Sequence, residues 1–296
     1  MDFRARYLEF LRSQLPAGIT GRRVGIDCSN GMASLLVHEI FPEAVTINDV
    51  PDGTFPCHSP NPLLPDSRVQ LSRLVREREL DCGIVFDGDA DRAMFIDERG
   101  EFVQPDYLIP VIAASFPTKG KVLHDVRTSR GAIEAIRELG CEPVMVPVGH
   151  AFAKPQMRAT GAICGGELAG HYYFSDFFGC DSAFLAAIRT LGEFRRRGSA
   201  FSEMMRPISS RYANSGELNF KVEDKDAAID RILATARSFA PVCGRSDLDG
   251  VRVEFDAGWI NVRKSNTEPY LRLIVEATTV ELMHDWRRQL ERAVAR

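Results

Sequence analysis

Three aspartates lie close together in the segment CGIVFDGDADRAMFID, residues 82 to 97. Asp87, Asp89 and Asp91 alternate along a short loop that follows an apolar run, so their carboxylates can converge. Converging carboxylates repel one another unless a cation lies between them. Because all the donors are oxygens, Mg²⁺ or Mn²⁺ suits the loop better than Zn²⁺. A solvated acidic turn is the alternative that these residues leave open.

Arg92 follows the last of these aspartates, and its guanidinium can pair with phosphate oxygens. A calcium loop fits poorly although Glu98 falls at the twelfth position, because the sixth position, which needs glycine, holds Arg92. A phosphatase that uses Asp87 as an aspartyl nucleophile stays open. The segment therefore predicts phosphate chemistry beside a metal ion.

A second polar loop, RKSNTEP, lies between two predicted strands. It offers a guanidinium, two hydroxyls and an amide, from Arg263, Ser265, Asn266 and Thr267. Together with backbone N–H groups, these donors suit a phosphate that is anchored and does not react. A polar hairpin turn capped by its serine and asparagine is the alternative.

The glycine-rich segment GGELAGH carries Glu167 and His171. Its glycines let the backbone approach a ligand, and a free carboxylate can accept hydrogen bonds from sugar hydroxyls. His150, in the segment VGH, and Lys154 four residues later are candidates for acid/base chemistry or phosphate contact. A histidine beside aromatic residues such as Tyr172 can instead be a structural group.

Strands and helices alternate along the segments that must position these loops, which is typical of α/β domains. Near the C-terminus, a predicted helix and two strands around RKSNTEP indicate a smaller α+β unit. The predicted fold is thus α/β, with two consecutive α/β domains (1–105 and 106–205) followed by a small α+β domain (206–296). The charged segment 195–211, which contains a proline, is the predicted linker.

The composition is that of an ordinary globular protein, with 45% hydrophobic and 26% charged residues among 296. The net charge of −4 and the lack of a long basic run argue against nucleic acid or an anionic membrane as a partner. Seven scattered cysteines without a C-x-x-C pair indicate reduced thiols. No segment approaches the ~18 consecutive apolar residues of a membrane span. We therefore expect a cytoplasmic protein with a small-molecule ligand.

Taken together, DGDADR, VGH with a following lysine, GELAGH and RKSNTEP resemble the α-D-phosphohexomutase superfamily in order and spacing. The resemblance extends over essentially the whole chain, to bacterial phosphomannomutase/phosphoglucomutase. It implies that the three aspartates bind Mg²⁺ and that Arg92 assists phosphoryl transfer, with His150 and Lys154 as further catalytic candidates. It also implies that Glu167 and His171 bind the sugar. The phosphate that is not transferred would be held by Arg263, Ser265, Asn266 and Thr267.

Two departures from the family pattern bear on function. Family members carry a phosphoserine in a first domain, whereas this chain resembles the second to fourth domains, and Ser59 in CHSPNP falls at an ordinary second-domain position. Leu168 and Ala169 stand where the family's sugar loop usually has methionine and serine. The missing hydroxyl removes one hydrogen bond, typically ~0.5 to 1.5 kcal/mol, and the leucine favours a hexose over a glucosamine phosphate.

The predicted function is interconversion of hexose 1-phosphate and hexose 6-phosphate, of mannose or glucose, through a hexose bisphosphate that would also act as activator. Without a phosphoserine, the chain would be one half of an enzyme, completed by a separate nucleophile domain or acting in a self-associated form. Two alternatives stay open. One is a phosphosugar-binding or regulatory protein without turnover, and the other is a Mg²⁺-dependent sugar-phosphate phosphatase.

Overall fold

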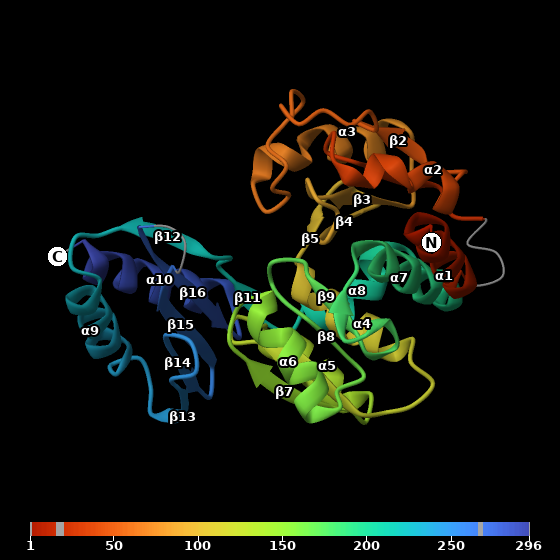
Figure 1. Cartoon of the computed structure of the whole chain (residues 1–296). Coiled ribbons are helices and arrows are strands. Elements are labelled where there is room, and N and C mark those ends of the chain that lie inside the picture. Colours follow the sequence, from red (N-terminus) through yellow and green to blue (C-terminus); the bar gives the residue numbers. More distant parts are fainter. Residues whose placement is uncertain (1, 16–20, 266–268, 296) are drawn as a thin grey trace.

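The computed structural model describes residues 2–15, 21–265 and 269–295. Three sheets follow one another along the chain, each with its own helices (Figure 1). The first two units are α/β, and the third is α+β with an antiparallel sheet. The predicted fold class is confirmed.

The first sheet has the strand order β2-β1-β3-β4-β5. β1 is parallel to β2 and β3, whereas β4 is antiparallel to both β3 and β5. The strands are β1 (Val24–Asp27), β2 (Val45–Ile47), β3 (Cys82–Phe86), β4 (Ala93–Asp97) and β5 (Phe102–Val103). The helices are α1 (Phe3–Gln14), η1 (Met32–Leu35), α2 (Val37–Ile40), η2 (Pro65–Arg68) and α3 (Val69–Glu77).

The second sheet repeats this topology, since its order β7-β6-β8-β9-β10 has the same sequence of parallel and antiparallel pairs. The strands are β6 (Lys121–Asp125), β7 (Glu142–Val146), β8 (Cys164–Gly166), β9 (Tyr172–Phe174) and β10 (Cys180–Asp181). The helices are η3 (Pro105–Tyr107), α4 (Leu108–Ala114), α5 (Arg130–Glu138), α6 (His150–Thr160), η4 (Ser175–Phe177), α7 (Ala183–Arg197) and α8 (Phe201–Ser209).

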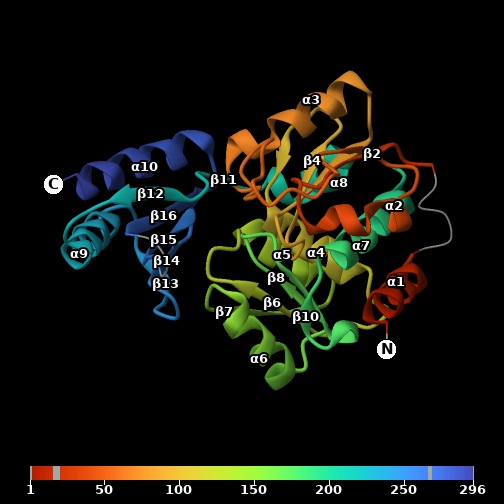
Figure 2. The ribbon, with the colours of Figure 1, turned by 45° about the horizontal axis from the view of Figure 1, so that its top comes forward.

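Helix α7 packs against the first sheet as well as against its own unit, as Figures 1 and 2 show. Its Phe184 stacks on Phe86 of β3, with ring centroids 4.8 Å apart. Phe201, at the start of α8, stacks on Phe95 of β4 at 5.7 Å. One hydrophobic core therefore runs through both α/β units.

The predicted linker at 195–211 is wrong. This segment contains the end of α7 and the whole of α8, whose Phe201, Met204, Met205 and Ile208 are buried. Its charge and its proline suggested a linker, but its apolar residues recur at helical spacing, and burial of that face holds the segment in the core.

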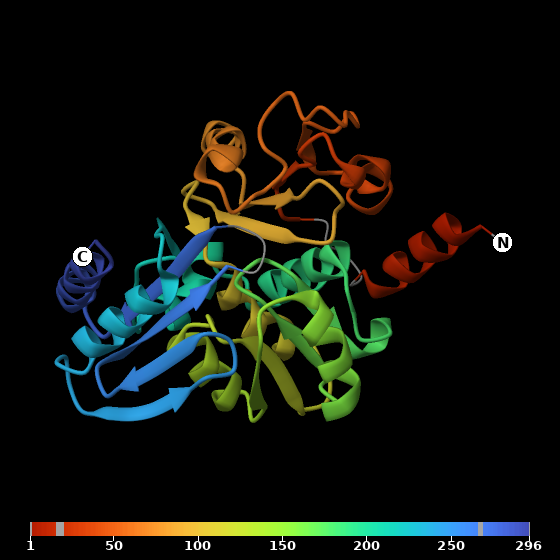
Figure 3. The ribbon, with the colours of Figure 1, turned by 60° about the vertical axis from the view of Figure 1, so that its left-hand side comes forward.

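The C-terminal sheet is antiparallel and has two helices on one face (Figures 1 and 3). Its strands are β11 (Ala213–Asn214), β12 (Leu218–Lys221), β13 (Val242–Ser246), β14 (Val251–Phe255), β15 (Gly258–Lys264) and β16 (Tyr270–Ala277), and its helices are α9 (Lys225–Ala236) and α10 (Val280–Val294). Because side chains alternate along a strand, Ile260 and Val262 pack under the helices, whereas Trp259, Asn261 and Arg263 lie on the opposite face.

All seven cysteines are free, as predicted, and Cys28, Cys82, Cys141 and Cys164 are buried. Burial raises the pKa of the Cys28 thiol to about 12, so this thiol stays protonated and unreactive near neutral pH. Among the helices that the structure describes, none combines the length and apolar character that a membrane crossing requires.

Candidate functional site

The aspartate loop (residues 87–92) joins β3 to β4, and the GELAGH loop (residues 166–171) occupies the equivalent position between β8 and β9. The two loops contact each other through their backbones. Arg92 and His171 form an antiparallel β-bridge, and the N–H of Ala93 donates to the carbonyl of Gly170 at 3.2 Å. Gly170 has a φ of +89°, a conformation that favours glycine, and a Cβ there would also lie 2.9 Å from the terminal methyl of Met94.

The three aspartates of the aspartate loop converge. Asp87, Asp89 and Asp91 each offer a carboxylate oxygen within 4.8 Å of the others. Burial raises the pKa of Asp87 to about 6, against the opposing effect of Arg92. Oδ1 of Asp91 is buried and accepts no hydrogen bond. Buried acceptors normally have a partner, and an oxygen-only donor set suits Mg²⁺ or Mn²⁺. These residues therefore fit such a cation.

Arg92 is fixed beside these carboxylates from two directions. Its Nε donates to Oδ2 of Asp87 at 2.5 Å, and its Nη1 donates to Oδ1 of Asn61 at 3.4 Å. The backbone N–H groups of Asp91 and Arg92 donate to the other Asp87 oxygen at 3.1 and 3.0 Å. Both oxygens of Asp87 are thus already engaged by donors.

Asp181 of β10, which the sequence motifs did not indicate, contacts two of the candidate acid/base residues. Its carboxylate lies 2.8 Å from Nζ of Lys154 and 3.1 Å from Nδ1 of His171. The ring of His150 lies 5.9 Å from that of His171, measured between centroids. Burial would lower the pKa of His171, but the hydrogen bond to Asp181 and the nearby carboxylates of Asp91 and Glu167 raise it. His171 is therefore held toward its protonated form.

Glu167 is enclosed, in contrast to the free carboxylate expected from the sequence. Its carboxylate is about 1% exposed and accepts hydrogen bonds from the Tyr173 hydroxyl at 2.5 Å and from Gly149 N at 3.1 Å. The next residue, Leu168, packs on Trp259 and Ile274 of the C-terminal sheet. The GELAGH loop is therefore tied to the C-terminal unit by an apolar contact.

Arg263 lies on the face of β15 that is turned away from the helices, and it belongs to a cluster of three arginines. Its Nη2 donates to Glu217 at 3.1 Å, and Glu217 also accepts from Nη1 of Arg272 at 3.0 Å and from Nη1 of Arg127 at 3.3 Å. Nε of Arg263 is buried and has no acceptor. Ser265 bonds through its backbone N–H to the carbonyl of Tyr270 at 2.9 Å. The predicted residues Asn266 and Thr267 lie outside the described part of the chain.

Arg127, Asp125 and Glu217 connect this arginine cluster to the GELAGH loop. Oδ2 of Asp125 accepts from Nη2 of Arg127 at 2.7 Å and from the N–H of Leu168 at 3.0 Å. The signal for Arg272 was present in the sequence, because strand alternation in YLRLIVEA places it on one face with Ile274. No local motif marks Glu217, whose partner Arg127 is 90 residues away.

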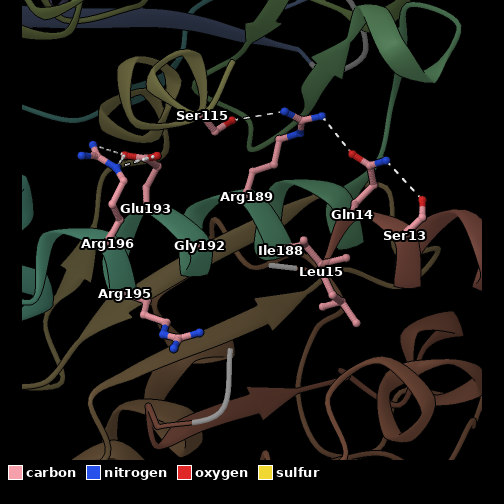
Figure 4. A pocket seen from close by; sticks show the side chains of 10 residues that line it. All are labelled: Ser13, Gln14, Leu15, Ser115, Ile188, Arg189, Gly192, Glu193, Arg195 and Arg196. Carbon is pink, nitrogen blue, oxygen red and sulfur yellow. Dashed lines mark hydrogen bonds and ion pairs between the residues drawn. The ribbon is translucent and has the colours of Figure 1, made fainter. Parts of the chain in front are cut away.

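A separate cavity of about 660 Å³ lies among α1, α4 and α7 (Figure 4). Arg189 crosses its wall and donates to Ser115 and Gln14, and its ion-pair partner is Asp176. None of the described candidate site residues lines this cavity. It is therefore distinct from the candidate site.

Comparison with known proteins shows three consecutive matches to one family. The models for phosphoglucomutase/phosphomannomutase domain II, domain III and the C-terminal domain match residues 5–100, 104–212 and 217–293. The chain belongs to the phosphoglucomutase/phosphomannomutase family, within the α-D-phosphohexomutase superfamily. The family's first domain is not matched within these residues, as predicted.

Individual relatives agree with this assignment. A protein of Xanthomonas campestris pv. campestris described as phosphohexose mutases is 36% identical over 278 residues, which cover 91% of this chain and 62% of the relative. The crystal structure of a phosphoglucomutase/phosphomannomutase family protein from Burkholderia thailandensis superposes with a TM-score of 0.86 at 28% identity, over 98% of this chain and 63% of that one.

A more distant solved structure has the same fold. It is the N-acetylphosphoglucosamine mutase of Aspergillus fumigatus in complex with GlcNAc-6P and magnesium, with a TM-score of 0.67 at 14% identity over 97% of this chain and 65% of that one. The present chain spans less than two thirds of the length of these relatives.

Proposed function

We propose that this chain forms the metal-binding, sugar-binding and phosphate-anchoring part of a phosphohexomutase that interconverts hexose 1-phosphate and hexose 6-phosphate. The observation that carries the proposal is the contact between the aspartate loop and the GELAGH loop, with the arginine cluster around Glu217 tied to the same loop. A phosphosugar with two phosphate positions needs two such sites, one reactive and one anchoring.

In this proposal the aspartate loop receives the reacting phosphate. Asp87, Asp89 and Asp91 would hold Mg²⁺ or Mn²⁺, which would neutralise negative charge that develops on the phosphoryl group. Arg92 is kept at the phosphate by its bonds to Asp87 and Asn61. It supplies a further positive charge there.

Proton transfer falls to the group around Asp181. Because Nδ1 of His171 bonds to Asp181, Nε2 is the ring atom that can give a proton to a sugar oxygen or take one from it. Lys154 holds Asp181 from the other side at 2.8 Å, so the carboxylate stays ionised and keeps the imidazole oriented. His150 completes the group beside the His171 ring.

The second phosphate of the substrate would be held by Arg263, with Ser265, Asn266 and Thr267 as further proposed contacts. The buried Nε of Arg263 offers a donor that lacks an acceptor, and a guanidinium binds phosphate in a bidentate manner. The distance between the two phosphate sites would then determine which sugar hydroxyl reacts. A hexose bisphosphate intermediate would occupy both sites at once.

Asp87 could act as a metal ligand or as an aspartyl nucleophile, and the assay below separates these two roles. In our proposal the nucleophile is a phosphoserine on a separate domain or polypeptide. Self-association of the chain is a second proposed way to cover the surface that such a domain would contact.

The test is a mutase assay on the whole chain with mannose 1-phosphate or glucose 1-phosphate, Mg²⁺ and a trace of hexose bisphosphate. It is run with and without a separately produced phosphoserine domain. We expect turnover only in the mixture, lost in Asp89→Asn and kept in the control Glu101→Gln, whose carboxylate is exposed on the next turn. Phosphate release by the chain alone that requires Asp87 would instead support a phosphatase. Binding of hexose phosphate without turnover in either sample would support a regulatory protein.

A further inference from the structure

The loop that follows β2 lies against the aspartate loop. A Cβ on Gly88 would lie 3.1 Å from the side chain of Pro60 and 3.3 Å from that of Phe55. Asn61 of the same loop accepts a hydrogen bond from Arg92. On another side, the N–H of Met32 donates to the carbonyl of Gly88 at 2.9 Å. Segments that carry none of the three aspartates thus fix the shape of the loop that does.

His58 anchors this loop to the first sheet. Its Nε2 lies 3.0 Å from Oδ2 of Asp27, the last residue of β1, and its Nδ1 lies 2.8 Å from the carbonyl oxygen of Ser59. Both partners can act as acceptors, so an imidazolium, with hydrogen on both ring nitrogens, satisfies both contacts. The side chain of His58 is 5% exposed and that of Asp27 is fully buried. This is a charged pair in a site shielded from water, where such hydrogen bonds are strong.

In the second α/β unit, an aspartate at the end of a strand also holds a loop, but without an intervening histidine. Asp125 ends β6 as Asp27 ends β1, and the two strands hold equivalent places in their sheets. Oδ1 of each carboxylate accepts from the N–H two residues later, from Arg127 at 2.7 Å and from Ser29 at 2.8 Å. Oδ2 of Asp125 then holds the GELAGH loop directly, through Leu168 N. In the first unit, His58 stands between the carboxylate and the loop that supports the aspartate loop.

We propose that His58 is a positioning residue: as an imidazolium bound to Asp27, it fixes the 55–61 loop and thereby the geometry of Gly88 and Arg92 at the metal-binding site. The part of this inference that concerns metal affinity rests on the proposed function, because it requires the aspartates to hold a divalent cation. The part that concerns the order of the aspartate loop does not.

The pair also predicts a pH dependence. The hydrogen bond to Asp27 raises the pKa of His58 above its usual value. A raised folded-state pKa means that the pair contributes fully below the ordinary histidine pKa of ~6.5 and that its contribution is lost as the pH rises through the folded value. Asp27 is the charged group that faces His58. Asp49 directly follows Asn48, whose side chain donates to Asp27. Asp49 is itself bonded to His38 and Thr46.

The experiment compares His58→Ala, His58→Gln and the control Cys57→Ala in the full chain. Cys57 is the neighbouring residue of the same loop and is exposed. Mn²⁺ affinity is measured by water proton relaxation, and the order of the loop by hydrogen exchange of residues 88–92 in metal-free protein. We expect His58→Ala to weaken Mn²⁺ binding about three- to tenfold and to speed exchange of the Asp91 and Arg92 amides. His58→Gln, which keeps one donor, should lie between, and Cys57→Ala should match the wild type.

Each outcome decides one claim. If His58→Ala exchanges and binds Mn²⁺ as the wild type does, the positioning role is refuted. If the wild type itself binds no Mn²⁺, the metal site of the proposed function fails, while the exchange data still decide whether His58 orders the loop. Should His58→Ala not fold, the wild type alone gives the answer. Its exchange at 88–92, corrected for the intrinsic rate, must accelerate as the pH rises above the ordinary histidine pKa of ~6.5, and an unchanged profile overturns the inference.

Discussion

Removing the charge of Glu217 should weaken the attachment of the C-terminal sheet to the second unit. Glu217 accepts hydrogen bonds from Arg127, Arg263 and Arg272 at 3.3, 3.1 and 3.0 Å. Glu217→Gln keeps the shape of the side chain but leaves three guanidiniums without their shared anion. Loss of one partner from a buried ion pair costs ~3 to 5 kcal/mol. Because Glu217 is 18% exposed, water screens part of the effect, and we expect about 3 kcal/mol at neutral pH.

The expected loss depends on pH in a defined direction. Burial would raise the pKa of Glu217, but Arg127, Arg263 and Arg272 lower it below its usual value. A lowered carboxylate pKa means that the stabilisation is present above the unfolded pKa of ~4.3 and is lost as the pH falls through the folded value. The wild type and Glu217→Gln should therefore converge in stability at acidic pH.

The assay is urea unfolding followed by tryptophan fluorescence, since Trp259 and Trp286 both lie in the C-terminal unit. The control is Glu223→Gln, which removes an exposed charge from the same unit. Inorganic phosphate should stabilise Glu217→Gln more than the wild type, because the guanidiniums of the variant lack the negative charge that Glu217 supplies and attract an anion more strongly. A loss below about 1 kcal/mol, equal to that of the control, or an equal phosphate effect in both proteins would refute the reasoning.

Three further outcomes are expected. Burial raises the pKa of Glu276 to about 7, so its contribution to stability should decline as the pH rises from ~4.3 to about 7. In unfolding curves recorded over this range, Glu276→Gln should show a smaller change of stability with pH than the wild type. Leu168→Ala should lower the free energy of unfolding by about 2 kcal/mol, because it leaves a cavity against Trp259; a change near zero would show that this contact is loose. Arg263→Lys should weaken binding of inorganic phosphate about tenfold by calorimetry, because lysine cannot bind it in a bidentate manner, and unchanged affinity would count against an anchoring role.

The sequence predicted the arrangement within the aspartate loop better than the contacts between loops. Asp87, Asp89 and Asp91 are neighbours along the chain, so local spacing sufficed to predict that they converge. Asp181 and Glu217 could not be found in this way, because their partners belong to other elements of the fold. Asp181 contacts Lys154 of α6 and His171 of the GELAGH loop, and Glu217 lies 90 residues from Arg127. Only packing of the three units brings such groups together.

Composition led to a wrong linker prediction where a helix carried both charged residues and a proline. The 195–211 segment resembles a linker in content, yet its Phe201 lies at the centre of the core shared by the first two units. The enclosed carboxylate of Glu167 was missed for a related reason. A residue on a glycine-rich loop suggests exposure, whereas the hydroxyl of Tyr173 and the N–H of Gly149 close over it only in the folded chain.

The packing of α7 against the first sheet determines which parts of this chain keep an intact core when they are separated. A fragment that ended after β5 would retain all three aspartates but would lose α7 and α8, whose Phe184 and Phe201 stack on Phe86 and Phe95. It would also lose the GELAGH loop, whose His171 forms the β-bridge to Arg92. The described residues of the first two units therefore share one core, although each unit repeats the same sheet topology. The C-terminal unit has its own core beneath α9 and α10, but it shares the arginine cluster with the second unit, since Arg263 and Arg272 belong to the one and Arg127 to the other. Exchange of the C-terminal unit would therefore replace only part of the proposed phosphate anchor.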